Sequence, residues 1–133
     1  MINVMSTPRF DLIGLVVKDM ATALNFYRAL GLPIPPEADS EPHVEVTLEG
    51  GLRIAWDAVT TIQTFDHDYR PRTGNTIGLA FALDTAQDVD ATYRRLVEAG
   101  YTGHKEPWDA FWGQRYAVVH DPDGHGVDLF AAL

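Results

Sequence analysis

Two stretches decide the fold, FDLIGLVV at residues 10–17 and IGLAFAL at residues 77–83, because the chain begins the same pattern at both. Each is a short apolar run with the tripeptide Ile-Gly-Leu, and such runs are typical of buried strands. Each is followed by a residue that favours a helix N-terminus, then by apolar positions at helical spacing, and then by a glycine that ends the helix. The shared order predicts a duplicated unit.

The first unit continues with segments that have clear sequence signals. After a helix at 20–30, which Asp19 caps and Gly31 ends, the prolines between residues 33 and 42 exclude a central strand because proline lacks the N–H donor. Alternating apolar residues predict strands at 44–48 and 52–56, joined by a turn at Glu49–Gly51. A polar connection without periodicity follows at 58–75.

The second unit repeats this order. A helical stripe from Ala86 to Val97 ends at Ala99-Gly100, and strands are predicted at 114–120 and 126–130. Between these strands the sequence Asp121-Pro122-Asp123-Gly124 is typical of a tight turn, since proline presets φ and glycine permits a positive φ. We therefore predict one domain over 1–133, made of two modules at about 9–57 and 76–131.

Composition sets the class of protein. The chain has 133 residues, of which 46% are hydrophobic and 22% charged, so one globular domain is expected. It contains no cysteine, which excludes a disulfide framework and thiol catalysis. A net charge of −9 opposes binding to nucleic acid or an anionic membrane. No long apolar segment is present, and residues 1–8 are not typical of a signal peptide, so a cytoplasmic protein is expected.

The duplicated pattern and its motifs resemble a known superfamily. They are Phe26-Tyr27 followed by Leu30-Gly31, the turn at Gly50-Gly51, and the Asp121–Gly124 turn followed by Asp128-Leu129. Together they resemble the vicinal oxygen chelate superfamily, which includes glyoxalase I, bleomycin-resistance proteins and extradiol dioxygenases. The resemblance implies an α+β fold of two βαβββ modules that form curled, cup-shaped mixed sheets with helices on the outer face. It also implies a homodimer.

The resemblance allows a test for a metal site. The positions that carry His or Glu ligands in metal-dependent members are occupied here by Leu12, Ala55, Gly78 and Asp128. Only Asp128 is a possible ligand, and among neighbours that would face the same way Asp57 is the one strong carboxylate. The five histidines fall in predicted connections, strand ends or turns, where a surface or turn role is expected. We therefore predict no metal and no cofactor.

A cluster of aromatic residues suggests what replaces the metal. Trp108, Phe111 and Trp112 lie in a predicted loop between Glu106 and Gly113, where rings are available to stack on a flat ligand. Small residues at 14, 78, 80 and 82 would leave room for that ligand inside the cup. The alternative is that the rings cover a sheet end or a dimer seam.

Charged residues complete the predicted site. Asp57, Asp109 and Asp128 would make the mouth of the pocket negative, and Arg53 and Arg115 would neutralise part of that charge. The predicted ligand-binding residues are therefore Trp108, Phe111, Trp112, Arg53, Asp57, Asp128 and Arg115.

These features predict a metal-independent binding protein that holds a planar aromatic compound, with a cationic one favoured, as in the drug-binding members of the family. Two alternatives stay open. One is a metal-dependent lyase or dioxygenase with an atypical carboxylate site, and the other is a non-catalytic scaffold. No nucleophile–base pair or phosphate-binding loop indicates another enzyme class. The sequence does not distinguish a role in antibiotic resistance from binding of a metabolite.

Overall fold

The computed structural model describes residues 6–72 and 77–133. The first half contains β1 (Leu12–Val17), α1 (Met20–Leu30), the 3-10 helix η1 (Pro36–Ser40), β2 (His43–Thr47), β3 (Arg53–Ala58) and α2 (Val59–Gln63). The second half contains β4 (Gly78–Ala82), α3 (Ala86–Glu98), β5 (Thr102–Ala110), β6 (Gln114–His120) and β7 (Gly126–Ala132). Within the described residues these strands form a three-stranded and a four-stranded sheet, which confirms the predicted α+β class.

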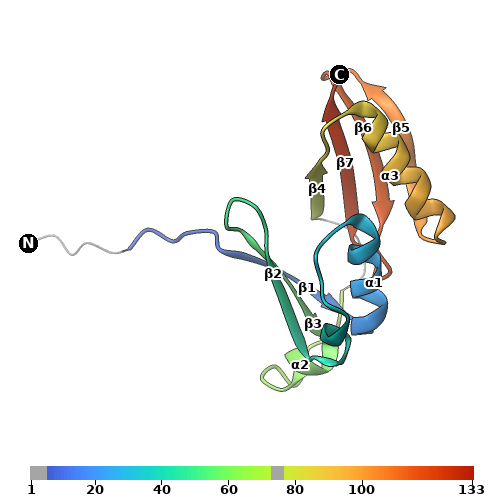
Figure 1. Ribbon diagram of the computed structural model, residues 1–133. Helices are drawn as coiled ribbons and strands as arrows, with labels where there is room; N and C mark the ends of the chain where they lie inside the picture. The colour runs from blue at the N-terminus through green and yellow to red at the C-terminus, as the bar shows by residue number, and fades with distance from the viewer. Residues whose placement is uncertain (1–5, 73–76) are drawn as a thin grey trace, which may run out of the picture.

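The two sheets share one topology. In sheet A, with strand order β1-β3-β2, β1 pairs in parallel with β3 and β2 pairs antiparallel with β3. In sheet B, with order β4-β7-β6-β5, β4 pairs in parallel with β7, and β6 is antiparallel to both of its neighbours. Helix α1 lies against sheet A and α3 against sheet B, on the same side of the molecule (Figure 1). The predicted internal repeat is therefore visible in the strand order.

The first module departs from the expected βαβββ pattern by one strand. Where the second module has β5, the first has η1, which contains Pro36 and directly follows Pro35. Proline cannot donate to a strand ladder, so this segment turns in a short helix and does not extend sheet A.

Helix α1 begins and ends as the sequence predicts. The Asp19 carboxylate accepts a hydrogen bond from the backbone N–H of Thr22, and Gly31 ends the helix with φ of 122°. Tyr27 on α1 and Trp56 on β3 are both fully buried, with ring centroids 5.2 Å apart. Trp56 therefore faces the helix, as its position next to Ala55 predicted.

The structure corrects the sequence-based prediction in two connecting segments. β5 covers most of the segment predicted as a ring-bearing loop, so Trp108 lies on a strand. The short helix α2 forms at the start of the predicted polar connection 58–75. Residues 73–75 of that connection, and residue 76 at the predicted start of the second module, lie outside the described residues.

The two modules are joined by a common core and by a polar contact. The buried core cluster draws residues from both halves, including Leu24, Trp56, Leu96 and Leu129. The hydroxyl of Tyr27 donates to Asp121 Oδ2 at 2.7 Å, which connects α1 to the turn between β6 and β7. No helix in the described part of the chain is both long and apolar enough to cross a membrane.

Candidate functional site

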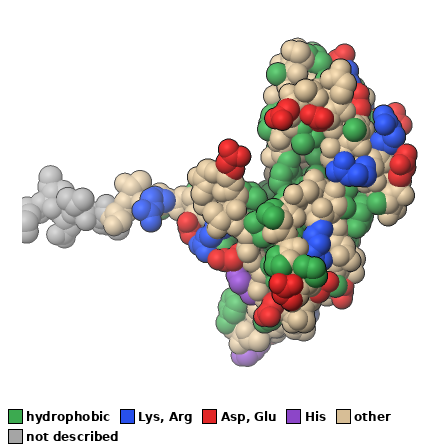
Figure 2. Space-filling view, in the orientation of Figure 1, with side chains coloured by type: hydrophobic (Ala, Val, Ile, Leu, Met, Phe, Trp, Pro, Cys, Tyr) green, Lys and Arg blue, Asp and Glu red, His purple; other side chains and the backbone are tan. Residues whose placement is uncertain are grey.

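In the part of the chain that the structure describes, α1 and α3 cover one face of each sheet and leave the other face open. On β7 the buried residues Val127, Leu129 and Ala131 alternate with the half-buried Asp128 and Phe130. Side chains alternate along a strand, so Asp128 and Phe130 point away from α3. Strand pairing places Tyr116 opposite Phe130, and Trp108 opposite Tyr116, on this open face of sheet B. In Figure 2, hydrophobic side chains gather along the middle of the molecule in this view.

Four aromatic side chains form a continuous wall on the open face of sheet B, which we call the ring wall: Trp108, Trp112, Tyr116 and Phe130. The Tyr116 ring stacks on Phe130 with centroids 6.1 Å apart, and meets Trp112 edge-on at 5.4 Å and Trp108 at 5.6 Å. Trp112 comes from the turn after β5, and its indole N–H donates to Gln114 Oε1 at 2.8 Å. Phe111 packs on Trp112 at 5.1 Å but is itself 96% exposed.

Polar groups flank the ring wall. The Tyr116 hydroxyl donates to Asp128 Oδ2 at 2.5 Å. Burial, together with this carboxylate, raises the pKa of Tyr116 to about 12, so the hydroxyl keeps its proton at neutral pH. The Lys105 ammonium lies 5.0 Å from the centroid of the Trp108 ring, within cation–π range. The wall therefore combines ring faces, a carboxylate and a ring that already attracts a cation.

Small residues lie beside the wall on β4. Pairing of β4 with β7 places Ala80 opposite Asp128 and Ala82 opposite Phe130. Ala80, Ala82 and Gly78 are exposed, and a Cβ built on Gly78 would come no closer than 4.0 Å to an Asp128 oxygen. Because these side chains are short, β4 leaves open space next to the rings.

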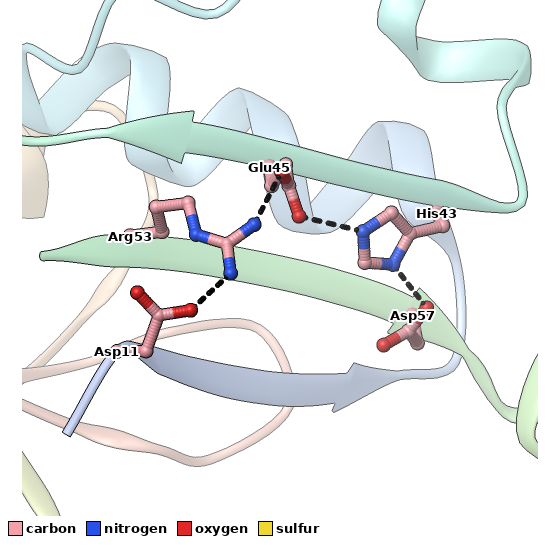
Figure 3. A network of polar contacts seen from close by, with 5 residues as sticks. All are labelled: Asp11, His43, Glu45, Arg53 and Asp57. Carbon is pink, nitrogen blue, oxygen red and sulfur yellow. Dashed lines mark hydrogen bonds and ion pairs between the residues drawn. The ribbon is translucent and has the colours of Figure 1, made fainter. Parts of the chain in front are cut away.

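The open face of sheet A carries a chain of ionic contacts instead of rings (Figure 3). His43 on β2 bonds to Asp57 Oδ1 through Nδ1 at 2.6 Å and to Glu45 Oε2 through Nε2 at 3.1 Å. Arg53 on β3 donates to Glu45 Oε1 at 2.8 Å and also pairs with Asp11. The five side chains alternate in charge across the sheet, so each carboxylate has a cationic partner when His43 is protonated.

The histidine is the part of this network that titrates near neutral pH. The hydrogen bonds to Asp57 and then to Glu45 raise the pKa of His43 above its ordinary value. The bond to His43 in turn lowers the pKa of Glu45. Since both ring nitrogens are engaged by carboxylates, the imidazolium form suits this position and neither nitrogen is left to act as a base.

We expect the His43 imidazole to titrate with a midpoint above 6.5, as followed by its Cε1–H signal in an NMR pH titration and assigned with His43→Gln. Asp57→Asn should lower the midpoint more than Glu45→Gln does, because the Asp57 bond is the shorter one. A folded-state pKa raised in this way adds stability that is complete below the unfolded pKa and is lost as the pH rises through the folded pKa. A midpoint at or below 6.5, or an Asp57→Asn variant that titrates like the wild type, would contradict this expectation.

The structure brings together some of the predicted site residues and separates others. Trp108, Trp112 and Asp128 share the open face of sheet B, with Phe111 at its rim. Arg53 and Asp57 lie on sheet A, each with its own ionic partner.

Two of the charges expected at one mouth lie on another surface. Arg115 alternates with Tyr116, and its guanidinium pairs with Asp90 of α3 at 2.6 Å and with Asp109 at 2.6 Å. Arg115 and Asp109 therefore sit on the helix side of sheet B, so the expected grouping of Asp57, Asp109 and Asp128 with both arginines is wrong as a single cluster.

The four positions examined for metal ligands lie on the strands where the resemblance expects them. Leu12 is on β1, Ala55 on β3, Gly78 on β4 and Asp128 on β7. Within residues 6–72 and 77–133, no group of three or more His, Asp and Glu side chains is arranged to hold a metal ion. Metal independence itself stays a prediction.

The predicted site lacked several contributors to the two open faces, among them Tyr116, Phe130, His43, Glu45 and Asp11. Glu45, Tyr116 and Phe130 lie on predicted strands next to apolar residues, and that alternation is the signal that could have placed them on the open faces. His43 lies one residue before the predicted strand 44–48. His104, expected in a connection, lies on β5 and stacks on His120 with centroids 4.5 Å apart. His125 bonds to Asp121 within the turn, as a local hydrogen-bonding role predicts.

The described residues form two modules of one topology, with α1 and α3 on a common side of the molecule. The chain belongs to the Glyoxalase/Bleomycin resistance protein/Dioxygenase superfamily, whose family model matches residues 9–129.

Several known proteins are similar to this chain in sequence or in fold. An uncharacterized protein of Mycobacterium bovis is 34% identical over 123 residues, covering 86% of this chain and 78% of its own length. A family enzyme from Burkholderia phytofirmans superposes with a TM-score of 0.81 at 20% identity, covering 95% of this chain and 100% of that one. A hypothetical protein from S. aureus has a TM-score of 0.75 at 23% identity, with coverages of 99% and 95%. At these identities the solved structures show the fold alone.

Proposed function

We propose that this protein binds a planar aromatic small molecule on the ring wall without a metal ion, and that it prefers a cationic compound. The observation that carries the proposal is the connected set of rings on an open sheet face, next to the short side chains of β4. Rings that are half-exposed offer faces for stacking, and each ring pair contributes about 0.5–1.5 kcal/mol beyond area burial.

The negative charge of Asp128 and of the chain as a whole supports the proposed preference for a cationic ligand. Asp128 presents a carboxylate beside Tyr116, and the whole chain carries a net charge of −9. The Lys105 ammonium already lies over Trp108, which indicates that a cation is accommodated at this ring. A ligand cation would compete with Lys105 for the same ring face and would gain about 0.5–2 kcal/mol there.

We expect proflavine, a planar cation, to quench the fluorescence of Trp108 and Trp112 in a Trp56→Phe background, in which these are the two tryptophans left of three. Trp112→Ala should weaken binding about tenfold, which corresponds to about 1.4 kcal/mol. Asp128→Asn should weaken binding of the cation but not of a neutral aromatic compound. Lys105→Gln should strengthen binding because it removes the competing ammonium.

Other outcomes favour the alternatives. Stoichiometric divalent metal in the purified protein, lost on Asp128→Ala, would favour a metal-dependent lyase or dioxygenase. No quenching by proflavine and other planar cations, together with dissociation of a homodimer on Trp112→Ala in sedimentation experiments, would favour a scaffold whose rings form a subunit contact. The homodimer and the cytoplasmic location remain predictions.

A further inference from the structure

A hollow lies between the two modules, and none of the ring-wall residues lines it. Its volume is about 760 Å³, and its lining comes from β1, β4, the residues after α2 and the turn between β6 and β7. A cavity of this volume falls in the range that small-molecule ligands occupy. The hollow is therefore large enough to be a binding site in its own right.

The lining includes apolar side chains from β1 and from the beginning of the second module. Ile13 and Leu15 contribute from β1, and Ile77 and Leu79 from the beginning of the second module. Ile77 is 69% exposed, so it presents an uncovered aliphatic side chain at the edge of this hollow. An apolar ligand body would remove this surface from water, which is favourable.

Basic residues outnumber acidic ones around the hollow, although the chain as a whole is acidic. Lys18 and Arg72 line it, whereas Asp123 is the one acidic residue in the described part of its lining. The Asp123 carboxylate accepts a hydrogen bond from the backbone N–H of Lys18 at 2.9 Å. Among the described residues, neither the Lys18 ammonium nor the Arg72 guanidinium lies within ion-pair distance of a carboxylate, although the Lys18 charge partly offsets the burial that raises the pKa of Asp123. Two cationic groups are thus available at the rim of an apolar surface.

His125 adds a third donor to the same lining. Its Nδ1 bonds to Asp121 Oδ2 at 2.7 Å, and its side chain is 29% exposed. This bond fixes the imidazole, and it is also the main reason that the pKa of His125 lies above its ordinary value. With Nδ1 engaged, Nε2 is the ring nitrogen that remains to donate a hydrogen bond.

We infer that the hollow between the modules binds a small molecule that has a carboxylate and an apolar body. The carboxylate would pair with Lys18 and Arg72, since oxyanions form strong charge-assisted hydrogen bonds with such groups. The apolar body would cover Ile13, Ile77 and Leu79. This site differs from the ring wall in its residues and in the sign of its charge, so it does not depend on the proposed function.

Calorimetry with 2-naphthoate and with 2-naphthylmethylammonium, which share a ring system but differ in charge, tests the inference. We expect 2-naphthoate to bind, and the double variant Lys18→Gln/Arg72→Gln to lower its affinity at least tenfold. The control is Arg70→Gln, which removes one positive charge, half of what the double variant removes, from a residue that does not line the hollow; it should change the affinity less than twofold. Trp112→Ala should leave binding of 2-naphthoate unchanged.

Three results would overturn the inference: no binding of 2-naphthoate, an equal loss with Arg70→Gln, or a loss with Trp112→Ala only. Backbone amide shifts of the wild-type protein give a second readout that needs no variant. On addition of 2-naphthoate they should move at residues 13–18 and 120–125, and movement confined to residues 108–116 would contradict the assignment. Proflavine binding tests the ring wall separately, so failure of one site is distinguishable from failure of the other.

Discussion

Asp121→Ala is expected to lower the free energy of unfolding by about 3–5 kcal/mol, the usual cost of leaving the partners of a buried charge unpaired. The Asp121 side chain is fully buried and accepts four hydrogen bonds. They come from the Tyr27 hydroxyl, the backbone N–H groups of Asp123 and His125, and the imidazole of His125. Burial opposes ionisation, but the bonds from His125 and Tyr27 outweigh it and hold the pKa of Asp121 below its ordinary value.

Urea unfolding monitored by circular dichroism measures this loss, and Tyr27→Phe is the matched control. That variant keeps the buried ring and removes one of the four bonds, so it should cost about 1 kcal/mol. Asp121→Asn should fall between the two because an amide oxygen still accepts from the backbone. If Asp121→Ala cost no more than Tyr27→Phe, the carboxylate would not be the centre of this contact.

Trp56→Ala is expected to lower the free energy of unfolding by about 3–5 kcal/mol, because it opens a cavity in the core of the first module. Trp56 is fully buried between β3 and α1 and packs against Tyr27. Its indole N–H has no hydrogen-bond partner among the described residues, so the side chain stabilises the core through packing and not through that group.

The variant Trp56→Phe separates the contribution of ring packing from that of the indole N–H. It keeps an aromatic ring at the same site and removes the unpartnered N–H, so its cost in thermal or urea unfolding should be at most half that of the alanine variant. Equal costs for the two variants would contradict a packing role. A small cost for Trp56→Phe also makes that variant a suitable background for fluorescence measurements on the ring wall.

The repeat could be predicted from the sequence because its signals are local. Helix α1 follows from Asp19, the apolar spacing behind it and Gly31, each of which acts within a few residues. β5 could not be predicted in the same way. It is an edge strand with two register shifts and contains Pro107, which an edge strand tolerates, so its sequence lacks regular alternation.

The candidate site was predicted only in part, because its grouping depends on register. The aromatic residues around 108–112 were found from composition, but their partners Tyr116 and Phe130 come from neighbouring strands. Arg115 is adjacent to Tyr116 in sequence, yet it faces α3, because neighbouring residues on a strand point to opposite faces. A charge cluster inferred from composition cannot separate the two faces of a sheet.

The contact between Tyr27 and the turn at Asp121 makes the two halves complementary and not interchangeable. Tyr93 is the eighth residue of α3, as Tyr27 is of α1, but its hydroxyl lies beside Gly103 of its own module, where a Cβ would approach it to 2.2 Å. The turn at residues 49–51 of the first module reads Glu-Gly-Gly and has no aspartate. A chain built from two copies of the first half would therefore lose this bond, because that half has no aspartate in its turn to accept it.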